Sequence, residues 1–323
     1  MFVLGLQGSP RKKSNTEFLL SLFMTEAQKY GAQTHIVDVC RKHIEPCKEF
    51  TTCERKGFCP IKDDMGPEIY PLLRKADVVV PASPVFFYNV TAQLKALIDR
   101  SQTLWARNYR LKLTDPNRRM RRGFMLCQGA TKGKNLFLGV DLTAKYFFDA
   151  VGAQYSGSLY YWQIEHRGDM ARHPGVRDDV AAAVGELLKP YTGRKKILFA
   201  SRRNAARGQI AAAFAQLMGG DKIEVMCGGK DPADKVDPLV EDVMAEKGID
   251  MGFRIPASIE AAVEAGCPDM IVTMGCDDIE TTPDAARIAW DLPDPEGEDI
   301  DSIRILRDET EKRVSELIDQ LDT

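Results

Sequence analysis

The sequence has few of the features that would place a protein in a membrane or outside a cell. No run of apolar residues approaches the roughly 20 that a membrane-spanning helix needs. The apolar run at residues 1–7 is followed by Arg11, Lys12 and Lys13, whereas a secretory signal has its charges first. We therefore expect a cytoplasmic protein with no membrane partner. In that compartment, eight cysteines are expected to be thiols or metal ligands rather than disulfides.

The sequence also lacks a motif for binding RNA or DNA, so we expect no nucleic-acid partner. Its net charge of −3 is unevenly distributed. Residues 231–323 hold 26 acidic and 8 basic residues, a net charge of −18, which leaves +15 for residues 1–230. The acidic part is either a solvated surface or a surface that docks on basic residues within or between chains. The basic cluster at residues 118–122 precedes a predicted strand, where we expect an exposed loop.

The length of 323 residues suggests two domains, and 44% hydrophobic content is enough for two full cores. Apolar strands alternate with amphipathic helices, twice over. Strands are predicted at residues 2–6, 34–39, 78–82, 123–127, 154–161, 197–200, 223–226 and 270–273, and helices at residues 16–30, 66–75, 91–105, 136–151, 176–188, 209–218 and 302–321. The stretch 189–196, with its Pro and Gly, divides the two series. The pattern predicts an α/β fold of two doubly wound parallel-sheet domains, residues 1–192 and 193–323.

A loop of small, hydroxyl and basic residues follows the first predicted strand. Residues 8–16 read Gly-Ser-Pro-Arg-Lys-Lys-Ser-Asn-Thr and lead into a helix, whose N-terminus attracts anions. On its own this loop also fits an ordinary turn in which Ser14 or Asn15 caps the helix. A second loop, residues 82–91, is rich in aromatic residues. It follows a central strand, at the sheet edge where doubly wound folds bind flat ligands.

Three segments give the first half a family resemblance. They are G-S-P-R-x-x-S-N-T, a cysteine cluster ending in Asp-Asp-Met, and S-P-V-F-F followed by L-K-x-x-I-D-R. Residues 1 to about 190 thus resemble the NAD(P)H-dependent FMN reductases, in particular the iron–sulfur flavoproteins. The resemblance implies a flavodoxin-like domain that binds FMN and takes electrons from NAD(P)H. The flavin carries the hydride and electron chemistry itself, so we expect no catalytic side chain.

The same resemblance implies which residues border the flavin. It places the FMN phosphate on Ser9, Arg11, Ser14, Asn15 and Thr16. It places the isoalloxazine ring beside Pro84, Val85, Phe86, Phe87 and Asn89, with Gln128, Gly129 and Thr131 closing the other side.

Four cysteines, Cys40, Cys47, Cys53 and Cys59, lie within 20 residues of one another. The iron–sulfur flavoproteins carry C-x2-C-x2-C-x5-C here, and the second of these positions is Phe50 in this chain. A [4Fe–4S] cluster normally has four thiolate ligands. Three alternatives remain open: a cluster with Cys40 as the fourth ligand, a remnant that binds no metal, and a zinc site.

The second half resembles the low-molecular-weight phosphotyrosine phosphatases and arsenate reductases, but its key cysteine is missing. In those families the frame C-x5-R follows a strand, and a thiolate opens a loop that cradles an oxyanion. Here residues 201–207 read Ser-Arg-Arg-Asn-Ala-Ala-Arg. Ser201 is far harder to ionise than a cysteine, and no histidine lies near it in sequence to act as its base. The second relay thiol matches Cys276, and the third position is Thr282.

The resemblance therefore implies an oxyanion loop that has lost its chemistry. Asn204, Arg207 and Asp294 match the loop and the general acid of the family. Arg202 and Arg203 make the loop more cationic, so it keeps its affinity for an anion or contacts the acidic surface of another subunit. We expect neither phosphatase nor arsenate reductase activity.

Both halves together predict an FMN-dependent NAD(P)H oxidoreductase with an inactive phosphatase-like domain. Its electrons pass to a flavin, a quinone, or another small-molecule or protein acceptor. The alternative is a non-catalytic flavoprotein, either an electron carrier or an oxyanion sensor. We expect a homodimer or a homotetramer.

Overall fold

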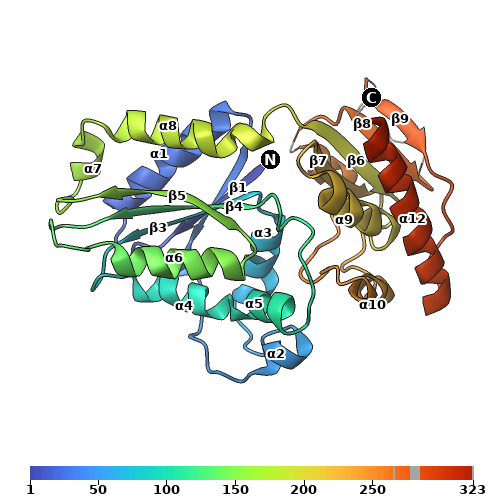
Figure 1. Cartoon of the computed structure of the whole chain (residues 1–323), viewed down its shortest axis with the longest axis horizontal. Coiled ribbons are helices and arrows are strands. Elements are labelled where there is room, and N and C mark those ends of the chain that lie inside the picture. Colours follow the sequence, from blue (N-terminus) through green and yellow to red (C-terminus); the bar gives the residue numbers. More distant parts are fainter. Residues whose placement is uncertain (265, 277–283, 322–323) are drawn as a thin grey trace. The chain divides into compact units, whose positions relative to one another are not determined.

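The structure, a computed structural model, describes residues 1–264, 266–276 and 284–321. They divide into two compact units, coloured along the chain in Figure 1. Unit 1 comprises Met1–Leu111 and Met120–Thr192, and unit 2 comprises Lys112–Arg119 and Gly193–Thr323. Each unit holds one parallel sheet, which confirms the predicted α/β fold. In the part of the chain that is described, no helix is long and apolar enough to cross a membrane.

Unit 1 is built on a five-stranded sheet with the order β2-β1-β3-β4-β5, which is the flavodoxin-like order. The strands are β1 (Phe2–Gln7), β2 (Gln33–Asp38), β3 (Val78–Pro84), β4 (Arg122–Gln128) and β5 (Gln154–Tyr161). All neighbouring strands pair in parallel. Every residue of β1 is buried, as expected for a central strand with helices on both faces.

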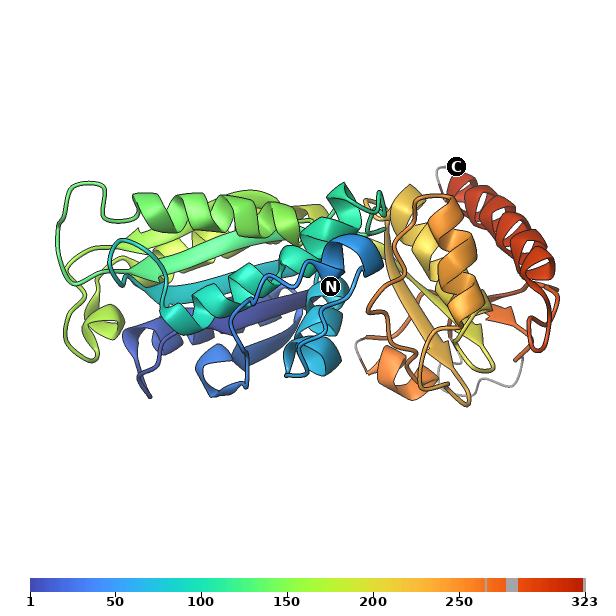
Figure 2. The ribbon, with the colours of Figure 1, turned by 90° about the horizontal axis from the view of Figure 1, so that it is seen from below.

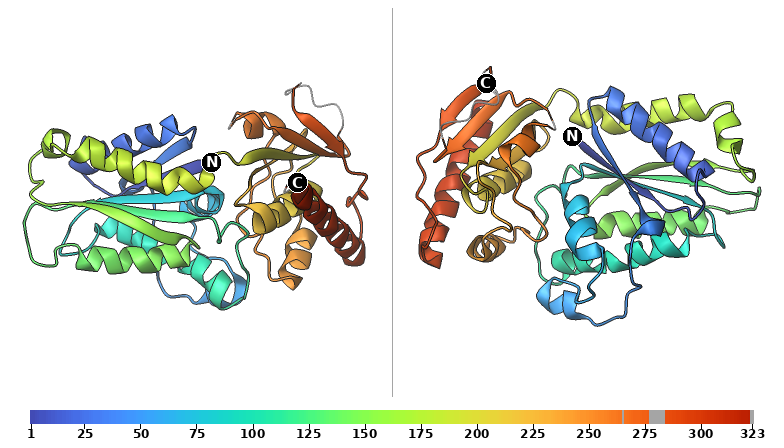
Figure 3. Two further views of the ribbon diagram at one scale, coloured as in Figure 1. Left: turned by 45° about the horizontal axis from the view of Figure 1, so that its top comes forward. Right: turned by 180° about the vertical axis from the view of Figure 1, so that it is seen from behind.

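Helices cover both faces of this sheet (Figure 1, Figure 3). On one face lie α1 (Asn15–Lys29), α7 (Asp169–Arg172) and α8 (Val176–Leu188), and on the other α3 (Tyr70–Lys75), α4 (Ala92–Arg100), α5 (Gln102–Tyr109) and α6 (Leu138–Ala150). Leu19, Leu20 and Phe23 of α1 pack with Val180 and Val184 of α8 in a core that continues into the sheet. The short helix α2 (Thr52–Lys56) lies in the cysteine-containing segment.

Two predictions for unit 1 were wrong in detail. The single helix predicted at residues 91–105 is two helices, α4 and α5, that meet at Ser101. Its hydroxyl donates to the carbonyl of Leu97 at 3.1 Å, a local bond that competes with the helical ladder. The basic cluster at residues 118–122 is not wholly exposed, because Arg121 is fully buried. Its guanidinium donates to the carbonyls of Arg74, Ala76 and Val151, which explains how its charge is accommodated.

Unit 2 is built on a four-stranded parallel sheet with the order β7-β6-β8-β9. The strands are β6 (Lys195–Ser201), β7 (Ile223–Gly229), β8 (Met270–Met274) and β9 (Ala286–Ala289), and the helices are α9 (Arg207–Gly219), α10 (Pro238–Glu246), α11 (Ile259–Val263) and α12 (Ile300–Gln320). Of these elements, α10, α11 and β9 were not predicted from the sequence.

The strand β6 shows how this sheet is covered on two sides. Ile197 and Phe199 belong to the core formed with α9, α10 and α12. Leu198 and Ala200 belong to a smaller core with Ile259 of α11. Figure 2 shows α11 on the side of the sheet away from α12.

A segment from the first half of the chain completes unit 2. Thr114 forms a parallel bridge with Ile249. The N–H of Thr114 donates to Gly248 at 2.7 Å, and the N–H of Asp250 donates to Thr114 at 2.9 Å. Residues 112–119, which the sequence analysis counted in the first domain, therefore pack with unit 2.

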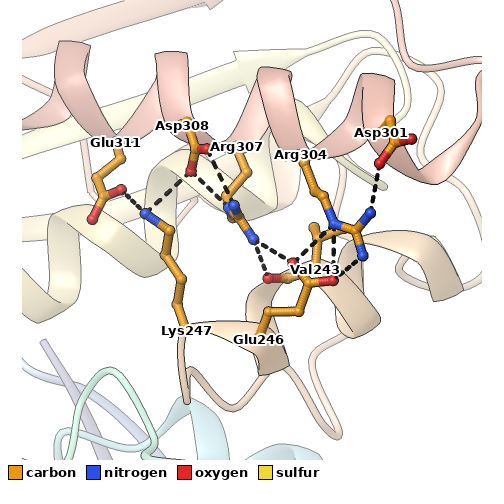
Figure 4. A network of polar contacts seen from close by, with 8 residues as sticks. All are labelled: Val243, Glu246, Lys247, Asp301, Arg304, Arg307, Asp308 and Glu311. Atoms are coloured by element: carbon orange, nitrogen blue, oxygen red, sulfur yellow. Dashed lines mark hydrogen bonds and ion pairs between the residues drawn. The ribbon is translucent and has the colours of Figure 1, made fainter.

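Ion pairs join α10 to α12 (Figure 4). Glu246 accepts from Arg304 at 2.5 Å and from Arg307 at 2.9 Å. Arg307 is mostly buried and also donates to the carbonyl of Val243 at 2.8 Å. Lys247 pairs with two carboxylates of α12. These contacts fix the long charged helix along its polar side.

Candidate functional site

Buried polar side chains lie at the carboxyl ends of β1, β3 and β4. The side-chain amide of Gln7 accepts from the N–H of Ser9 and donates to its carbonyl. The hydroxyl of Thr91 donates to the carbonyl of Gly8 at 2.6 Å. A Cβ on Gly8 would lie 2.9 Å from Leu94, so only glycine lets the loop pass this close to α4. The loops that leave these strands are thus held firmly at one edge of the sheet.

The phosphate loop, residues 8–16, presents unpaired donors at the start of α1. Ser14 caps the helix, its hydroxyl accepting from the N–H of Glu17 at 3.1 Å. Within the described residues, the N–H groups of residues 12–16 donate to no protein acceptor. Arg11 is exposed and has no ion-pair partner there. A 15-residue helix with free N–H groups and an adjacent guanidinium fits the phosphate of FMN.

Three of the predicted phosphate ligands have side chains that are engaged elsewhere. The amide of Asn15 donates to the carbonyl of His166 at 2.9 Å and accepts from the N–H of Gly168 at 3.1 Å. The buried hydroxyl of Thr16 accepts from the amide of Gln128. The hydroxyl of Ser9 accepts from the N–H of Arg11 at 3.3 Å. At Asn15 and Thr16, the backbone rather than the side chain is free to meet a phosphate.

A strained hairpin carries the predicted aromatic residues. Phe86 and Asn89 exchange two backbone bonds of 2.8 and 3.0 Å. Between them, Phe87 and Tyr88 have φ of 47° and 63°, a left-handed turn that normally contains Asn and Gly. Phe87 is fully exposed, at 103%. Bulky side chains held in this conformation are uncommon and cluster at functional sites, which favours a binding role for residues 86–89.

The loop after β4 meets this hairpin at the same edge of the sheet. The N–H of Val85 donates to the carbonyl of Gln128 at 2.9 Å, and a Cβ on Gly129 would lie 3.5 Å from the side chain of Val85. Gln128 is buried, and its Oε1 has no partner among the described residues. Thr131 lies further out and is exposed. The structure thus brings the phosphate loop, residues 84–89 and residues 128–131 to one place.

Five cations in the loops at this edge were not among the site residues predicted from the sequence. Lys12, Lys13, Lys132, Lys134 and Arg167 follow β1, β4 and β5. All are exposed, and within the described chain none has an ion-pair partner. In the sequence, their position directly after predicted strands was the feature that could have indicated these cations as site residues.

The cysteine-containing segment brings three of its four thiols near one another. Burial raises the pKa of Cys53, and the neighbouring Cys59 and Cys47 raise it further. None of the other three cysteines contributes to the pKa shift of Cys40. Its pKa is raised to about 11 by burial and by Asp38. Phe50 is 54% exposed.

The cysteine side chains of this segment do not form a metal centre in the described structure. In the described ranges, no three His, Cys, Asp or Glu side chains are positioned to hold a metal ion. The cluster with Cys40, the remnant and the zinc site all remain predictions. Iron and zinc analysis of protein purified without oxygen distinguishes them.

A buried ion pair anchors this segment to α4. The carboxylate of Asp63 accepts from Arg100 at 2.5 and 3.1 Å, and both side chains are almost fully buried. Arg100 also donates to the carbonyl of Glu45 at 2.8 Å. Burial would raise the pKa of Asp63, but the bonds from Arg100 and from two backbone N–H groups hold it below its usual value. The Asp-Asp-Met and I-D-R motifs therefore contain the two halves of one contact.

In unit 2, the anion loop (residues 201–207) has its peptide groups fixed by the segment that follows β7. The carbonyls of Ser201, Arg202, Arg203 and Ala205 accept from the N–H groups of Lys230, Asp231, Ala233 and Asp237 at 2.9–3.3 Å. A planar trans peptide points its C=O and N–H in opposite directions. The N–H groups of residues 202, 203 and 206 therefore point away from that segment. In the described part of the chain they donate to no protein acceptor.

Ser201 lies in this ring of donors. It is buried, and its hydroxyl accepts from the N–H of Asn204 at 3.2 Å. Asn204 has φ of 49°, which turns the loop back toward α9. The loop and residues 294–297 line a cavity of about 180 Å³. This arrangement is a nest of N–H groups at a helix N-terminus, which binds anions.

Arg207 and Asp294, two more of the predicted residues, also meet at this loop. Arg207 lies 3.6 Å from the carboxylate of Asp294. Arg202 and Arg203 are exposed at the rim. Cys276 is buried in the smaller core with Leu198 and Ile259, and Thr282 lies outside the described residues.

Fold and sites together define two classes of protein in one chain. Unit 1 is a flavodoxin-like α/β unit whose anion nest and aromatic hairpin share one sheet edge. Unit 2 is a phosphatase-like α/β unit with an oxyanion loop.

Comparison with known proteins gives the families. Residues 1–160 match the family model of NADPH-dependent FMN reductase, and residues 196–323 match that of low molecular weight phosphotyrosine protein phosphatase. The chain therefore joins a unit of the FMN reductase family to a unit of the low-molecular-weight phosphatase and arsenate reductase family.

Individual relatives carry flavoprotein and arsenate reductase names. An iron-sulfur flavoprotein of Methanosarcina thermophila is 41% identical over 112 residues, which are 35% of this chain and 58% of that protein. The chain thus spans little more than half the length of the flavoproteins that it matches. A Halobacterium salinarum protein with arsenate reductase in its name is 34% identical over 131 residues, 39% of this chain and 92% of that protein. A solved thioredoxin-dependent arsenate reductase of Corynebacterium glutamicum is 26% identical, with a TM-score of 0.36, over 46% of this chain and 77% of that one.

Proposed function

We propose that unit 1 is an FMN-dependent NAD(P)H oxidoreductase that passes electrons to a quinone, a flavin or another small-molecule or protein acceptor. The observation that carries the proposal is the meeting of a free N–H nest with an exposed aromatic hairpin at one sheet edge. Arg11 and the N–H groups of residues 12–16 would hold the FMN phosphate. Residues 84–89 and 128–131 would border its ring. Bound FMN supplies the hydride and electron chemistry.

The unpaired cations support a phosphate-rich second ligand. Lys12, Lys13, Lys132, Lys134 and Arg167 are more positive charge than one FMN phosphate requires. NADH adds a pyrophosphate, and NADPH adds a further phosphate group. Charge-assisted bonds to these groups are about twice as strong as neutral ones, so the cations favour such a donor.

A turnover assay tests this proposal. Protein loaded with FMN is mixed with NADH or NADPH and a quinone, and oxidation of the nicotinamide is followed by absorbance. Catalytic turnover supports an oxidoreductase. A single reduction of the bound flavin without turnover supports the alternative, an electron carrier. Failure to reduce the flavin at all contradicts both.

We propose that unit 2 binds oxyanions without turning them over. Its anion loop keeps the N–H nest and Arg207, but Ser201 replaces the thiolate. The loss of the thiolate removes the nucleophile that the family's phosphatase and arsenate reductase chemistry requires. Binding of inorganic phosphate, without hydrolysis of an aryl phosphate, is the expected result. Hydrolysis that disappears in Ser201→Ala would contradict the proposal.

A further inference from the structure

Carboxylates of the same chain lie at the mouth of the anion loop. Residues 294–298 form a turn, in which the N–H of Glu296 donates to Asp294 at 3.3 Å and that of Glu298 donates to the carbonyl of Pro295 at 3.3 Å. From this turn, Asp294 reaches within 3.6 Å of Arg207 and Glu296 within 3.3 Å of Arg203. The same residues line the cavity above the nest.

The two arginines occupy different levels of the site. The side chain of Arg207 is only 10% exposed, so it belongs to the floor of the cavity. Arg203 is 54% exposed and belongs to the rim. Arg202 stands beside it, exposed and without a carboxylate partner among the described residues. An anion bound by the N–H groups of the loop would contact Arg207 inside the cavity, and Arg203 and Arg202 would lie nearer the solvent.

The carboxylates contact the guanidinium groups but leave the nest itself free. Neither Asp294 nor Glu296 accepts from an N–H of residues 202–208 in the described chain. A tetrahedral oxyanion uses both kinds of donor, because it has oxygens for the N–H groups and for the arginines. The turn has the advantage of being tethered, which gives its carboxylates a high effective concentration.

We propose that Asp294 and Glu296 form a carboxylate latch that competes with tetrahedral oxyanions of the phosphate class for Arg207 and Arg203. Binding of a dianion displaces the latch, whereas a simple carboxylate, which offers no more than the latch does, is excluded. This inference rests on the proposed oxyanion binding by unit 2.

Calorimetric titration of the full-length protein with inorganic phosphate tests the latch. The variant is Glu296→Gln, and the control is Glu298→Gln, which removes the same charge from the same turn. Glu298 is exposed and has no ion-pair partner in the described residues. Because an exposed ion pair is weak, we expect Glu296→Gln to bind phosphate about two- to fivefold tighter and Glu298→Gln to bind it as the unaltered protein does.

A second background separates the latch from general charge repulsion. In Arg203→Gln, the gain from Glu296→Gln should vanish, because the carboxylate then has no guanidinium to occupy. Equal effects of Glu296→Gln and Glu298→Gln, or a gain that persists in Arg203→Gln, would overturn the latch while leaving the oxyanion site intact. No phosphate binding by any of these proteins would reject the site and the latch together.

Discussion

Ser201 stands where the thiolate of a working phosphatase would be, yet the groups that would stabilise an anion there are retained. The N–H groups of residues 202, 203 and 206 point away from the segment that holds their carbonyls. Such groups at a helix N-terminus lower the pKa of a cysteine. Position 201 would therefore stabilise a negative charge, but the serine hydroxyl there does not ionise near neutral pH.

Ser201→Cys should therefore acquire an unusually acidic thiol. We expect its alkylation by iodoacetamide to reach half its maximal rate well below pH 8.5, about the usual thiol pKa. Peptide mapping by mass spectrometry separates this site from the native cysteines. Ser156→Cys, at an exposed position of β5, is the control and should show the usual pH dependence. If the two sites titrate alike, the nest does not act on residue 201.

Arg11 has no ion-pair partner among the described residues, and the hydroxyl of Ser14, which accepts from the N–H of Glu17, keeps its own proton to donate to a phosphate. Replacing both by Ala should weaken FMN binding roughly 100-fold or more, since a hydrogen bond to a charged group contributes about 1.5–3 kcal/mol. Fluorescence titration of apoprotein with FMN measures the change. Arg41→Ala, which removes an exposed arginine beside Asp38, should leave the affinity unaltered. An undiminished affinity in the double variant would show that the phosphate lies elsewhere.

Among the elements, α4 links the flavin edge to the cysteine segment. Its N-cap residue Thr91 holds the phosphate loop through Gly8, and its last residue Arg100 holds Asp63. Unpairing a buried charge is costly because the remaining ion is left desolvated. The geometry of both loops therefore depends on one nine-residue helix.

Asp63→Asn should lower the free energy of unfolding by about 3–5 kcal/mol, because Arg100 would keep its buried charge without a counterion. Urea unfolding followed by circular dichroism measures the loss. Asp99→Asn breaks an exposed pair with Lys95 on the same helix and should cost at most about 1 kcal/mol. Similar losses in the two variants would mean that the buried pair does not anchor the segment.

The pairing of α10 with α12 predicts a dependence on pH. Bonds from Arg304 and then Arg307 lower the pKa of Glu246 from its usual 4.5 to about 2. A carboxyl with a depressed folded-state pKa stabilises the fold above its unfolded pKa, and this contribution is lost as pH falls. Glu246→Gln should therefore be less stable than the unaltered protein above pH 4.5, and the difference should shrink toward pH 2.

Denaturant midpoints at several pH values follow this difference. Glu316→Gln is the control, because Glu316 has only a loose pair with Lys312 at 4.0 Å. It should differ little from the unaltered protein at any pH. A difference for Glu246→Gln that stayed constant from pH 7 to pH 3 would show that its charge does not stabilise the helix pair.

For the whole molecule, the fold was predictable from sequence because its signals are local. Alternating apolar strands and amphipathic helices gave both sheets, and the hydroxyl and basic residues after β1 and β6 marked both anion loops. Contacts between distant residues left no such signal. The side-chain amide of Asn15, for example, bonds to the backbone of His166 and Gly168, about 150 residues away.

Other features could not be predicted because a residue's burial and packing depend on the distant residues that it contacts. Arg121 belongs to a cluster that a charge count places in solvent, yet three backbone carbonyls hold it inside. Residues 112–119 carry no sign that they complete unit 2. The left-handed turn at Phe87 and Tyr88 contradicts local propensity and is apparent only in three dimensions.

The central claim is that unit 1 binds FMN and accepts electrons from a reduced nicotinamide. The most direct test is the absorbance spectrum of FMN-saturated protein after gel filtration, recorded without oxygen before and after addition of NADPH. We predict one FMN retained per chain, with its visible absorbance band bleached by NADPH far faster than that of free FMN. Loss of the flavin on the column, or a retained flavin that NADPH leaves oxidised, would contradict the account.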